Sequence, residues 1–203
     1  MLLDFSQIYK KYNLQVKGVL HIGAHYGQED WVYRSLGINN IMYFEPIENN
    51  FKELQNRIGE TAILHKLALG NDTKKIKMFV ETANQGMSSS ILKPNLHVSQ
   101  YPHIVFDTEE EVNMVKLDDV NFQRDGYNMI NIDVQGYELE VFKGSVNTLE
   151  YVDVILTEIN KDHLYENGAL INDLISFLEP FGFELVEENW AGGNWGDGLF
   201  IKK

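Results

Sequence analysis

Four short stretches of the sequence carry side chains able to do chemistry, and each one follows or ends an apolar run. They are "HIGAHYG" (21–27), "YFEP" (43–46), "INIDVQG" (130–136) and "ILTEIN" (155–160). The first combines two glycines with two histidines, and the others each hold one carboxylate: Glu45, Asp133 or Glu158. Ligands of open α/β sheets bind beyond the carboxyl ends of the strands, so a parallel sheet would gather these groups at one edge.

The turn at 21–27 indicates a nucleoside ligand when it is taken together with Glu45. Its pattern is G-x-x-x-G, at Gly23 and Gly27, and not the G-x-G-x-x-G that admits a dinucleotide pyrophosphate. Such a turn suits the amino-acid end of a ligand, although purely structural turns also have this spacing. Glu45 lies 22 residues after Gly23, close to the spacing of an acid that binds ribose hydroxyls. A solvated glutamate at a strand end is the alternative. The combination favours S-adenosylmethionine over NAD.

Groups that could accept a proton are expected at the fourth and fifth strand ends. The candidates are Asp133, Glu158 and His163, because two carboxylates at one sheet edge can bind an ammonium, hold a metal or accept a proton. Each carboxylate is also a common strand-end residue when taken singly. A divalent ion held by Asp133 and Glu158 is possible, but we do not favour it.

Two segments are candidates for the substrate walls. The glycine-rich "ENWAGGNWGDG" (187–197) presents indoles that could stack on a sugar ring or merely pack on the loop. Residues 84–111 have no clear period, and long loops of this kind are often lids. The substrate candidates are Ser89, Ser90, His97, Gln135, Trp190 and Trp195.

Apolar, β-branched runs alternate with amphipathic ones, which predicts an α/β fold with a largely parallel sheet. Strands are expected at 18–23, 41–45, 62–69, 129–134 and 152–159, with a closing antiparallel pair at 183–188 and 198–203. Helices are expected at 28–36, 48–58, 137–143 and roughly 166–179. A hairpin pairs 74–81 with 111–117, and residues 1–16 form an N-terminal helical extension of a single domain over 1–203.

Composition narrows the function classes. The net charge of −13 argues against a nucleic-acid partner, because such proteins usually have basic surfaces. No apolar run approaches ~18 residues, so no membrane span is expected. The absence of cysteine and of a secretory signal favours a cytoplasmic location. The expected partner is a small molecule or glycan, and the oligomeric state is left open.

The motifs, in their order, resemble those of the FkbM-type methyltransferases, a branch of the class I S-adenosylmethionine-dependent enzymes. The resemblance covers roughly residues 17–202 and rests most on "INIDVQGYELEVFKGS" (130–145), since the family often carries D-V-E-G-x-E there. It implies a Rossmann-like, seven-stranded, mostly parallel sheet with an antiparallel last strand and helices on both faces. It also implies methyl transfer to a hydroxyl of a sugar, glycan or natural product. Gln135 replaces the usual glutamate, and His21 stands where many members have aspartate.

The resemblance also assigns cofactor residues. Gly23, Ala24 and Gly27 would line the methionine moiety, Glu45 would bind the ribose, and Asp133 would lie near the sulfonium. The full set of cofactor candidates is His21, Gly23, Ala24, His25, Gly27, Glu45, Pro46, Lys66, Leu67, Ala68 and Asp133. Two alternatives stay open: an NAD-linked oxidoreductase on a similar fold, and a non-catalytic scaffold domain of a glycan-synthesis protein.

Overall fold

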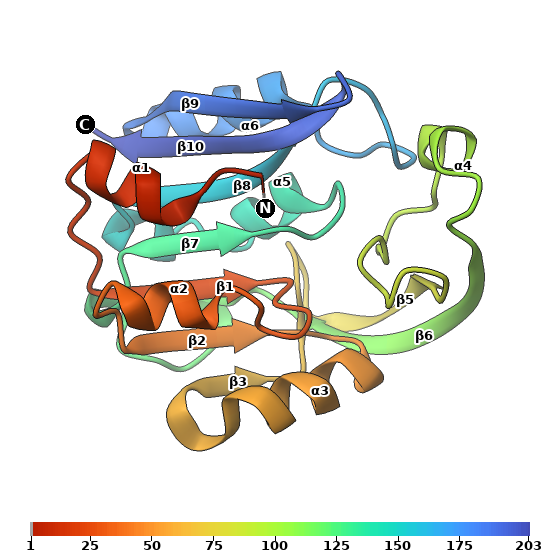
Figure 1. Cartoon of the computed structure of the whole chain (residues 1–203), viewed down its shortest axis with the longest axis horizontal. Helices are drawn as coiled ribbons and strands as arrows, with labels where there is room; N and C mark the ends of the chain where they lie inside the picture. The colour runs from red at the N-terminus through yellow and green to blue at the C-terminus, as the bar shows by residue number, and fades with distance from the viewer. Residues whose placement is uncertain (1) are drawn as a thin grey trace.

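A computed structural model describes residues 2–203, and its centre is a seven-stranded sheet (Figure 1). The strand order is β3-β2-β1-β7-β8-β10-β9. Only β10 runs against the others, because it pairs antiparallel with both of its neighbours. The expected mostly parallel sheet with an antiparallel last strand is therefore confirmed. The strands are β1 (Gly18–Ile22), β2 (Asn40–Phe44), β3 (Ile63–His65), β7 (Met129–Ile132), β8 (Val154–Asn160), β9 (Phe183–Ala191) and β10 (Trp195–Lys202).

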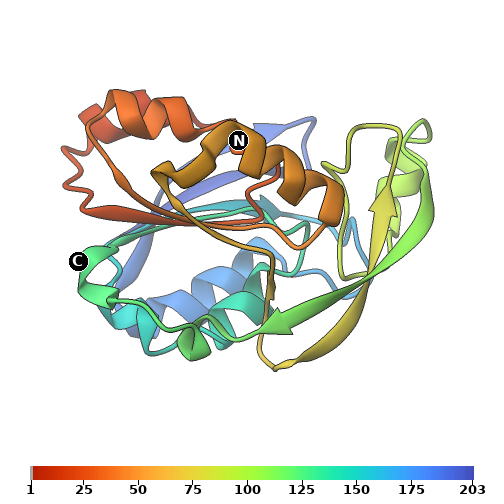
Figure 2. The same ribbon diagram turned by 90° about the horizontal axis from the view of Figure 1, so that it is seen from below.

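Helices cover both faces of this sheet (Figure 2). Val19 of β1 packs with one set of helices, whereas its neighbour Leu20 packs with the other set, as the alternation of side chains along a strand requires. The longest helix in residues 2–203 has 11 residues, and none there is long and apolar enough to cross a membrane. The first face carries α1 (Phe5–Lys11), α2 (Asp30–Ser35) and α3 (Glu48–Ile58), and the second carries α5 (Glu138–Lys143) and α6 (Ile171–Leu178).

The same alternation places the three predicted carboxylates on one side of the sheet. Glu45 and Glu158 each come two residues after a strand residue whose side chain packs under the first set of helices. Asp133 comes four residues after such a strand residue. Residues an even number apart along a strand share a face. The sheet therefore brings all three to the same face of its carboxyl edge. The strand residues that fix this parity are Tyr43, Leu156 and Met129.

A second, three-stranded sheet stands beyond that edge (Figure 1). Its strands β5 (Lys74–Glu81) and β6 (Phe106–Val115) form an antiparallel hairpin, and β4 (Ala68–Leu69) joins β6 in parallel. The connection between β5 and β6, residues 82–105, contains the short helix α4 (Leu96–Gln100). We call this connection loop 82–105.

Several expected boundaries are wrong. The closing strands are longer than expected, since β9 runs to Ala191 and β10 begins at Trp195, so most of the predicted loop 187–197 is strand. The apolar run 62–69 is not one strand, because the chain leaves the main sheet after β3 and enters the small sheet at β4. The expected helix at 166–179 begins only at Ile171, because Asn167 has a positive φ and the Asp173 carboxylate accepts the Leu170 N–H where the helix starts. The expected loop 84–111 ends early, since its last residues pair with β5 as part of β6.

Candidate functional site

Two adjoining cavities open at the carboxyl edge of the main sheet, and loop 82–105 forms part of the wall of both. The narrow cavity measures about 60 Å³ and the wide cavity about 560 Å³. The cavities meet where the turn after β1 faces the turn after β7. Five residues line both cavities: Gly23, His25, Met87, Asp133 and Gln135.

The glycines of the turn after β1 are explained by chain packing. Gly23 has a φ of 76°, and a Cβ there would lie 1.9 Å from the carbonyl oxygen of Asp133. Only glycine lets the two turns approach this closely. A Cβ at Gly27 would meet the side chain of Leu54 in α3 at 2.8 Å, and Gly27 lines neither cavity. Gly27 therefore serves chain packing, and its contact with a cofactor stays a prediction.

Glu45 is a buried carboxylate on the wall of the narrow cavity. Its oxygens accept the backbone N–H groups of His25 and Ile47, each at 2.9 Å. Burial raises the pKa of Glu45 to about 7, against the opposing effect of these N–H donors. A carboxylate has about four lone-pair positions, so Glu45 can still accept hydrogen bonds from a ligand.

His25 connects the turn after β1 to loop 82–105. Its ring Nδ1 lies 2.7 Å from the side-chain amide nitrogen of Gln28, so Nδ1 accepts and Nε2 carries the proton. Nε2 then donates to the carbonyl oxygen of Gln85 at 2.8 Å. The backbone of His25 has a φ of 50°, and its ring stacks on Tyr26. The wall shared by the two cavities is therefore fixed by specific contacts.

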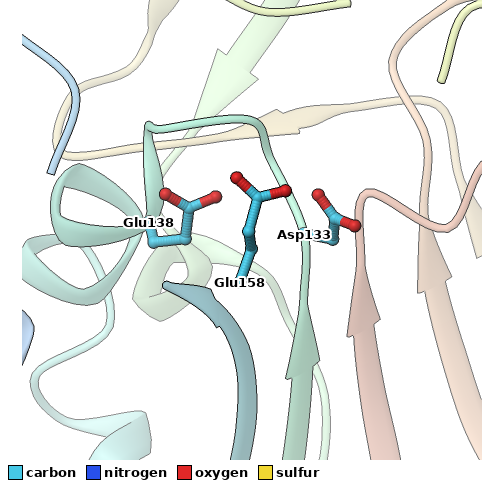
Figure 3. A group of neighbouring side chains, drawn as sticks. All are labelled: Asp133, Glu138 and Glu158. Atoms are coloured by element: carbon cyan, nitrogen blue, oxygen red, sulfur yellow. The ribbon is translucent and has the colours of Figure 1, made fainter. Parts of the chain in front are cut away.

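Three carboxylates lie in a row at the turn after β7 (Figure 3). Asp133, Glu158 and Glu138 each place an oxygen within 4.8 Å of the others. Burial, with the nearby Asp133 and Glu138, raises the pKa of Glu158 well above its usual range. Burial and Asp133 raise the pKa of Glu138 to about 7, although the N–H groups of Val134 and Gly136 donate to it. Glu158 and Glu138 therefore retain protons at a higher pH than free carboxyls.

Gln135 lies between two members of this row. Its amide nitrogen donates to Asp133 Oδ1 at 2.7 Å and to Glu158 Oε2 at 2.6 Å. Oxygens this close together could coordinate a divalent cation. A cation placed between Asp133 and Glu158 would have to displace the N–H groups of Gln135, so this pair as it stands fits a hydrogen-bond donor better than a metal.

Aromatic and imidazole side chains form the far wall of the wide cavity. His97 is 5% exposed, and its Nδ1 has no hydrogen-bond partner within residues 2–203. Trp195 donates its indole N–H to the hydroxyl of Tyr101 at 2.8 Å. His21 is also buried, and burial lowers the pKa of its imidazole. This wall offers both flat rings and hydrogen-bonding groups to a ligand.

Most of the sequence-predicted site residues do reach these cavities. Ser89 is buried on the wall of the narrow cavity, and its hydroxyl accepts the backbone N–H of Glu81 at 3.2 Å. The narrow cavity is lined by the predicted Gly23, His25, Glu45, Pro46, Leu67, Ala68, Ser89, Asp133 and Gln135. The wide cavity is lined by the predicted His21, Gly23, Ala24, His25, His97, Asp133, Gln135, Glu158 and Trp195.

Four further candidates line neither cavity. His163 is exposed, with its Nδ1 2.9 Å from the carbonyl oxygen of Gly168, and the structure does not bring it to the carboxylates as the sequence predicts. Lys66 forms an ion pair with Glu48 on the surface. The remaining two support the site from outside. Trp190 packs on the core under the ammonium group of Lys161, and Ser90 donates its hydroxyl to the carbonyl oxygen of Gln135 at 2.8 Å.

Sequence reasoning missed four functional candidates. Glu138 could have been found, because an acid five residues after Asp133 belongs to the D-V-x-G-x-E pattern. Asn50 lines the narrow cavity and bonds to Glu45, Glu29 lines the wide cavity, and the Tyr165 hydroxyl lies 2.8 Å from Gln135 Oε1. Nothing in the local sequence marks these three residues.

Comparison with known proteins points to one family. The Methyltransferase FkbM domain matches residues 21–185. The 2-O-methyltransferase NoeI of Sinorhizobium fredii is 33% identical over 104 residues, which are 50% of this chain and 42% of that protein. The chain thus matches less than half the length of this curated relative.

Two solved structures share the fold at low sequence identity. Magnesium protoporphyrin IX methyltransferase from Synechocystis PCC 6803, with bound S-adenosylmethionine, has a TM-score of 0.56 at 9% identity, covering 98% of this chain and 76% of that one. The ribosomal protein L11 methylase of Lactobacillus delbrueckii subsp. bulgaricus has a TM-score of 0.54 at 12% identity, covering 98% and 75%. The strand order of the sheet and the cavities at its carboxyl edge are consistent with the matched domain. The chain belongs to the FkbM family of methyltransferases.

Proposed function

We propose that this chain is an S-adenosylmethionine-dependent O-methyltransferase that acts on a hydroxyl group of a sugar, glycan or related small molecule. The observation that carries the proposal is the meeting of two cavities at Asp133 in a member of the FkbM family. One cavity would take the donor nucleoside and the other the acceptor.

We assign the nucleoside end of the donor to the narrow cavity, on the chemistry of its walls. Glu45 accepts hydrogen bonds from His25, Ile47 and Asn50, which leaves about one acceptor position for a ribose hydroxyl. Apolar side chains for an adenine ring are contributed by Ile47, Leu67, Met78 and Ile91. The cavity ends at Gly23 and Asp133, where the methionine part of the donor would enter the wide cavity.

The wide cavity supports a neutral, hydroxyl-rich acceptor. Among the described residues that line it, none is lysine or arginine. A phosphate or carboxylate on the acceptor would therefore lack a cationic partner. The flat ring of Trp195 and the free Nδ1 of the His97 imidazole suit a sugar ring that carries hydroxyls. Loop 82–105 contributes His97 and Tyr101, so we assign it to acceptor recognition.

The chain's own groups would align the acceptor and remove its proton. When bound, the donor supplies a methyl group already activated by a sulfonium sulfur. The acceptor oxygen would form a bond to the methyl carbon as the carbon–sulfur bond breaks, leaving a neutral thioether. We assign the departing hydroxyl proton to Asp133 at the junction of the cavities, because the raised pKa of Glu158 favours its protonated form. A positioned base is worth about 10²–10⁴-fold in rate.

Calorimetric titration of the full chain with S-adenosylhomocysteine, and in parallel with NAD, tests the donor assignment. We expect the homocysteine nucleoside alone to bind, and Glu45→Ala to weaken it while the exposed control Glu60→Ala does not. Binding of NAD alone would support the oxidoreductase instead. Absence of both signals, with a normal unfolding transition, would favour a scaffold domain.

The acceptor class needs a separate assay. Methyl transfer from labelled S-adenosylmethionine should reach neutral pyranosides and not the matching sugar phosphates. Preferential methylation of the phosphates would contradict the acceptor assignment, because the wide cavity offers no cation to hold them.

A further inference from the structure

Gln135 uses every polar atom of its side chain within the candidate site. Its two amide N–H groups reach Asp133 Oδ1 at 2.7 Å and Glu158 Oε2 at 2.6 Å. Its amide oxygen lies 2.8 Å from the hydroxyl of Tyr165. The side chain thus bridges the acids that follow or end two neighbouring strands, β7 and β8.

The orientation of this amide follows from the chemistry of its neighbours. The amide nitrogen is the atom of Gln135 that lies toward both acids, and an ionised Asp133 carboxylate, which only accepts hydrogen bonds, requires this orientation. The amide oxygen faces the Tyr165 hydroxyl, whose one proton is shared with the carbonyl oxygen of Ser88 at 2.7 Å. The main chain of Gln135 is also held, because Ser90 donates its hydroxyl to the Gln135 carbonyl oxygen at 2.8 Å. Its φ of 55° belongs to this fixed turn.

Within residues 2–203, no lysine or arginine side chain pairs with the three acids, so none takes the place of the Gln135 amide. Asp133, Glu138 and Glu158 take part in none of the ion pairs with lysine or arginine that the described residues form. The N–H groups of Gln135 stabilise negative charge on Asp133 and hold Glu158 beside it without adding a net charge of their own. The other ionisable groups that interact with these acids across the site are His21, Tyr165 and Asp197.

We propose that Gln135 is a positioning residue of the methyl-transfer site: its amide ties Asp133 to Glu158 and holds the Asp133 carboxylate at the junction of the cavities, in the place where a cation would otherwise be required. The inference rests on the proposed function for the role of Asp133. The link between the two acids can be measured independently of that role.

Two substitutions that keep the Cβ and the length of the side chain separate charge from shape. Gln135→Glu replaces the donors with a further carboxylate beside Asp133 and Glu158. Gln135→Met removes the donors and adds no charge. Gln55→Glu, at an exposed position of α3, makes the same charge change away from the site.

The first readout is the thermal unfolding midpoint of the full chain at about pH 6 and about pH 8.5, in EDTA or in excess MgCl₂. We expect Gln135→Glu to have the largest loss at the higher pH in EDTA. Protonation or magnesium should restore much of that loss, since either one supplies the missing positive partner. Gln135→Met should show a smaller loss of the unfolding midpoint, and magnesium should not change it. Magnesium should also leave the midpoints of the wild type and of Gln55→Glu unchanged. Equal midpoints for Gln135→Glu and Gln55→Glu under all conditions would overturn the proposal.

The second readout is the affinity for S-adenosylhomocysteine. We expect Gln135→Glu to weaken it about tenfold at the higher pH, and less at the lower pH, because the Asp133 carboxylate is no longer held. Unchanged affinity would remove the positioning role. Failure of the wild type itself to bind this probe would count against the proposed function, while the thermal readout would still decide whether Gln135 ties the acids together.

Discussion

Glu138→Gln is the substitution whose effect on stability can be worked out most fully. Glu138 is fully buried on α5, and one oxygen accepts the N–H groups of Val134 and Gly136 at 3.0 and 3.1 Å. Its other oxygen has no partner within the described chain. A glutamine has the same shape, keeps an acceptor for the two N–H groups, and cannot ionise.

The sign of the pH effect follows from the direction of the pKa change. The pKa of Glu138 rises from 4.5 to about 7 on folding, so the folded chain holds this proton more tightly than the unfolded chain does. The stability linked to this proton is fully present below about pH 4.5 and is lost as the pH rises through about 7. At roughly 1.4 kcal/mol per pKa unit, the wild type loses on the order of 3 kcal/mol across this interval.

Urea unfolding at about pH 5 and about pH 8 would measure the difference, with Glu140→Gln on the same helix as the control. Near pH 5 the glutamine variant should match the wild type or be slightly less stable. Near pH 8 the variant should be more stable than the wild type by up to about 3 kcal/mol. About 1 kcal/mol of this gain should be lost, because an amide oxygen accepts the two N–H groups less strongly than a carboxylate does. A variant that loses stability equally at both pH values would refute the reasoning, because it would show that Glu138 is ionised and well solvated in the folded chain.

Three further substitutions test other parts of the site. Glu45→Ala should weaken S-adenosylhomocysteine binding by about 1–3 kcal/mol in calorimetry, because buried N–H groups lose their acceptor along with the ribose; an affinity equal to that of the wild type would remove Glu45 from the donor site. Gly23→Ala should lower the thermal midpoint as well as binding, since its Cβ would lie 1.9 Å from the Asp133 carbonyl oxygen; loss of binding at a normal midpoint would give this glycine a purely ligand-contact role. Asp133→Asn should reduce methyl transfer by about 10²-fold or more without a comparable loss of stability, and turnover at the wild-type level would assign the base elsewhere.

The parts of the site that could be predicted from sequence are those fixed by strand ends. Glu45, Asp133 and Glu158 each follow or end an apolar run, and parallel strands carry their last residues to a common edge. Alternation along the strands then decides the face. Both rules are local, so a single sequence is enough to apply them.

The parts that could not be predicted depend on where a chain goes after it leaves the sheet. His163 comes shortly after β8, as Asp133 comes after β7, yet the connection that holds His163 leads to an exposed position. Trp190 and Trp195 are five residues apart on the two strands of one hairpin, but only Trp195 lines the wide cavity. The run 62–69 is divided between two sheets, and no residue in it marks the change. These outcomes are decided by tertiary pairing, which local periodicity does not encode.

Loop 82–105 closes a hairpin whose strands already pair with one another up to Glu81 and Phe106. Its ends are therefore held together whatever its own length, and doubling such a loop costs only about 0.6 kcal/mol of chain entropy. Insertions, deletions and new side chains can accumulate there while β1, β2 and β7 stay unchanged. Changes in the second half of this loop, which carries His97, Tyr101 and Ile104, can thus reshape one wall of the wide cavity and leave the narrow cavity intact. Under the proposed function, a lineage built on this fold acquires new acceptors more easily than a new donor.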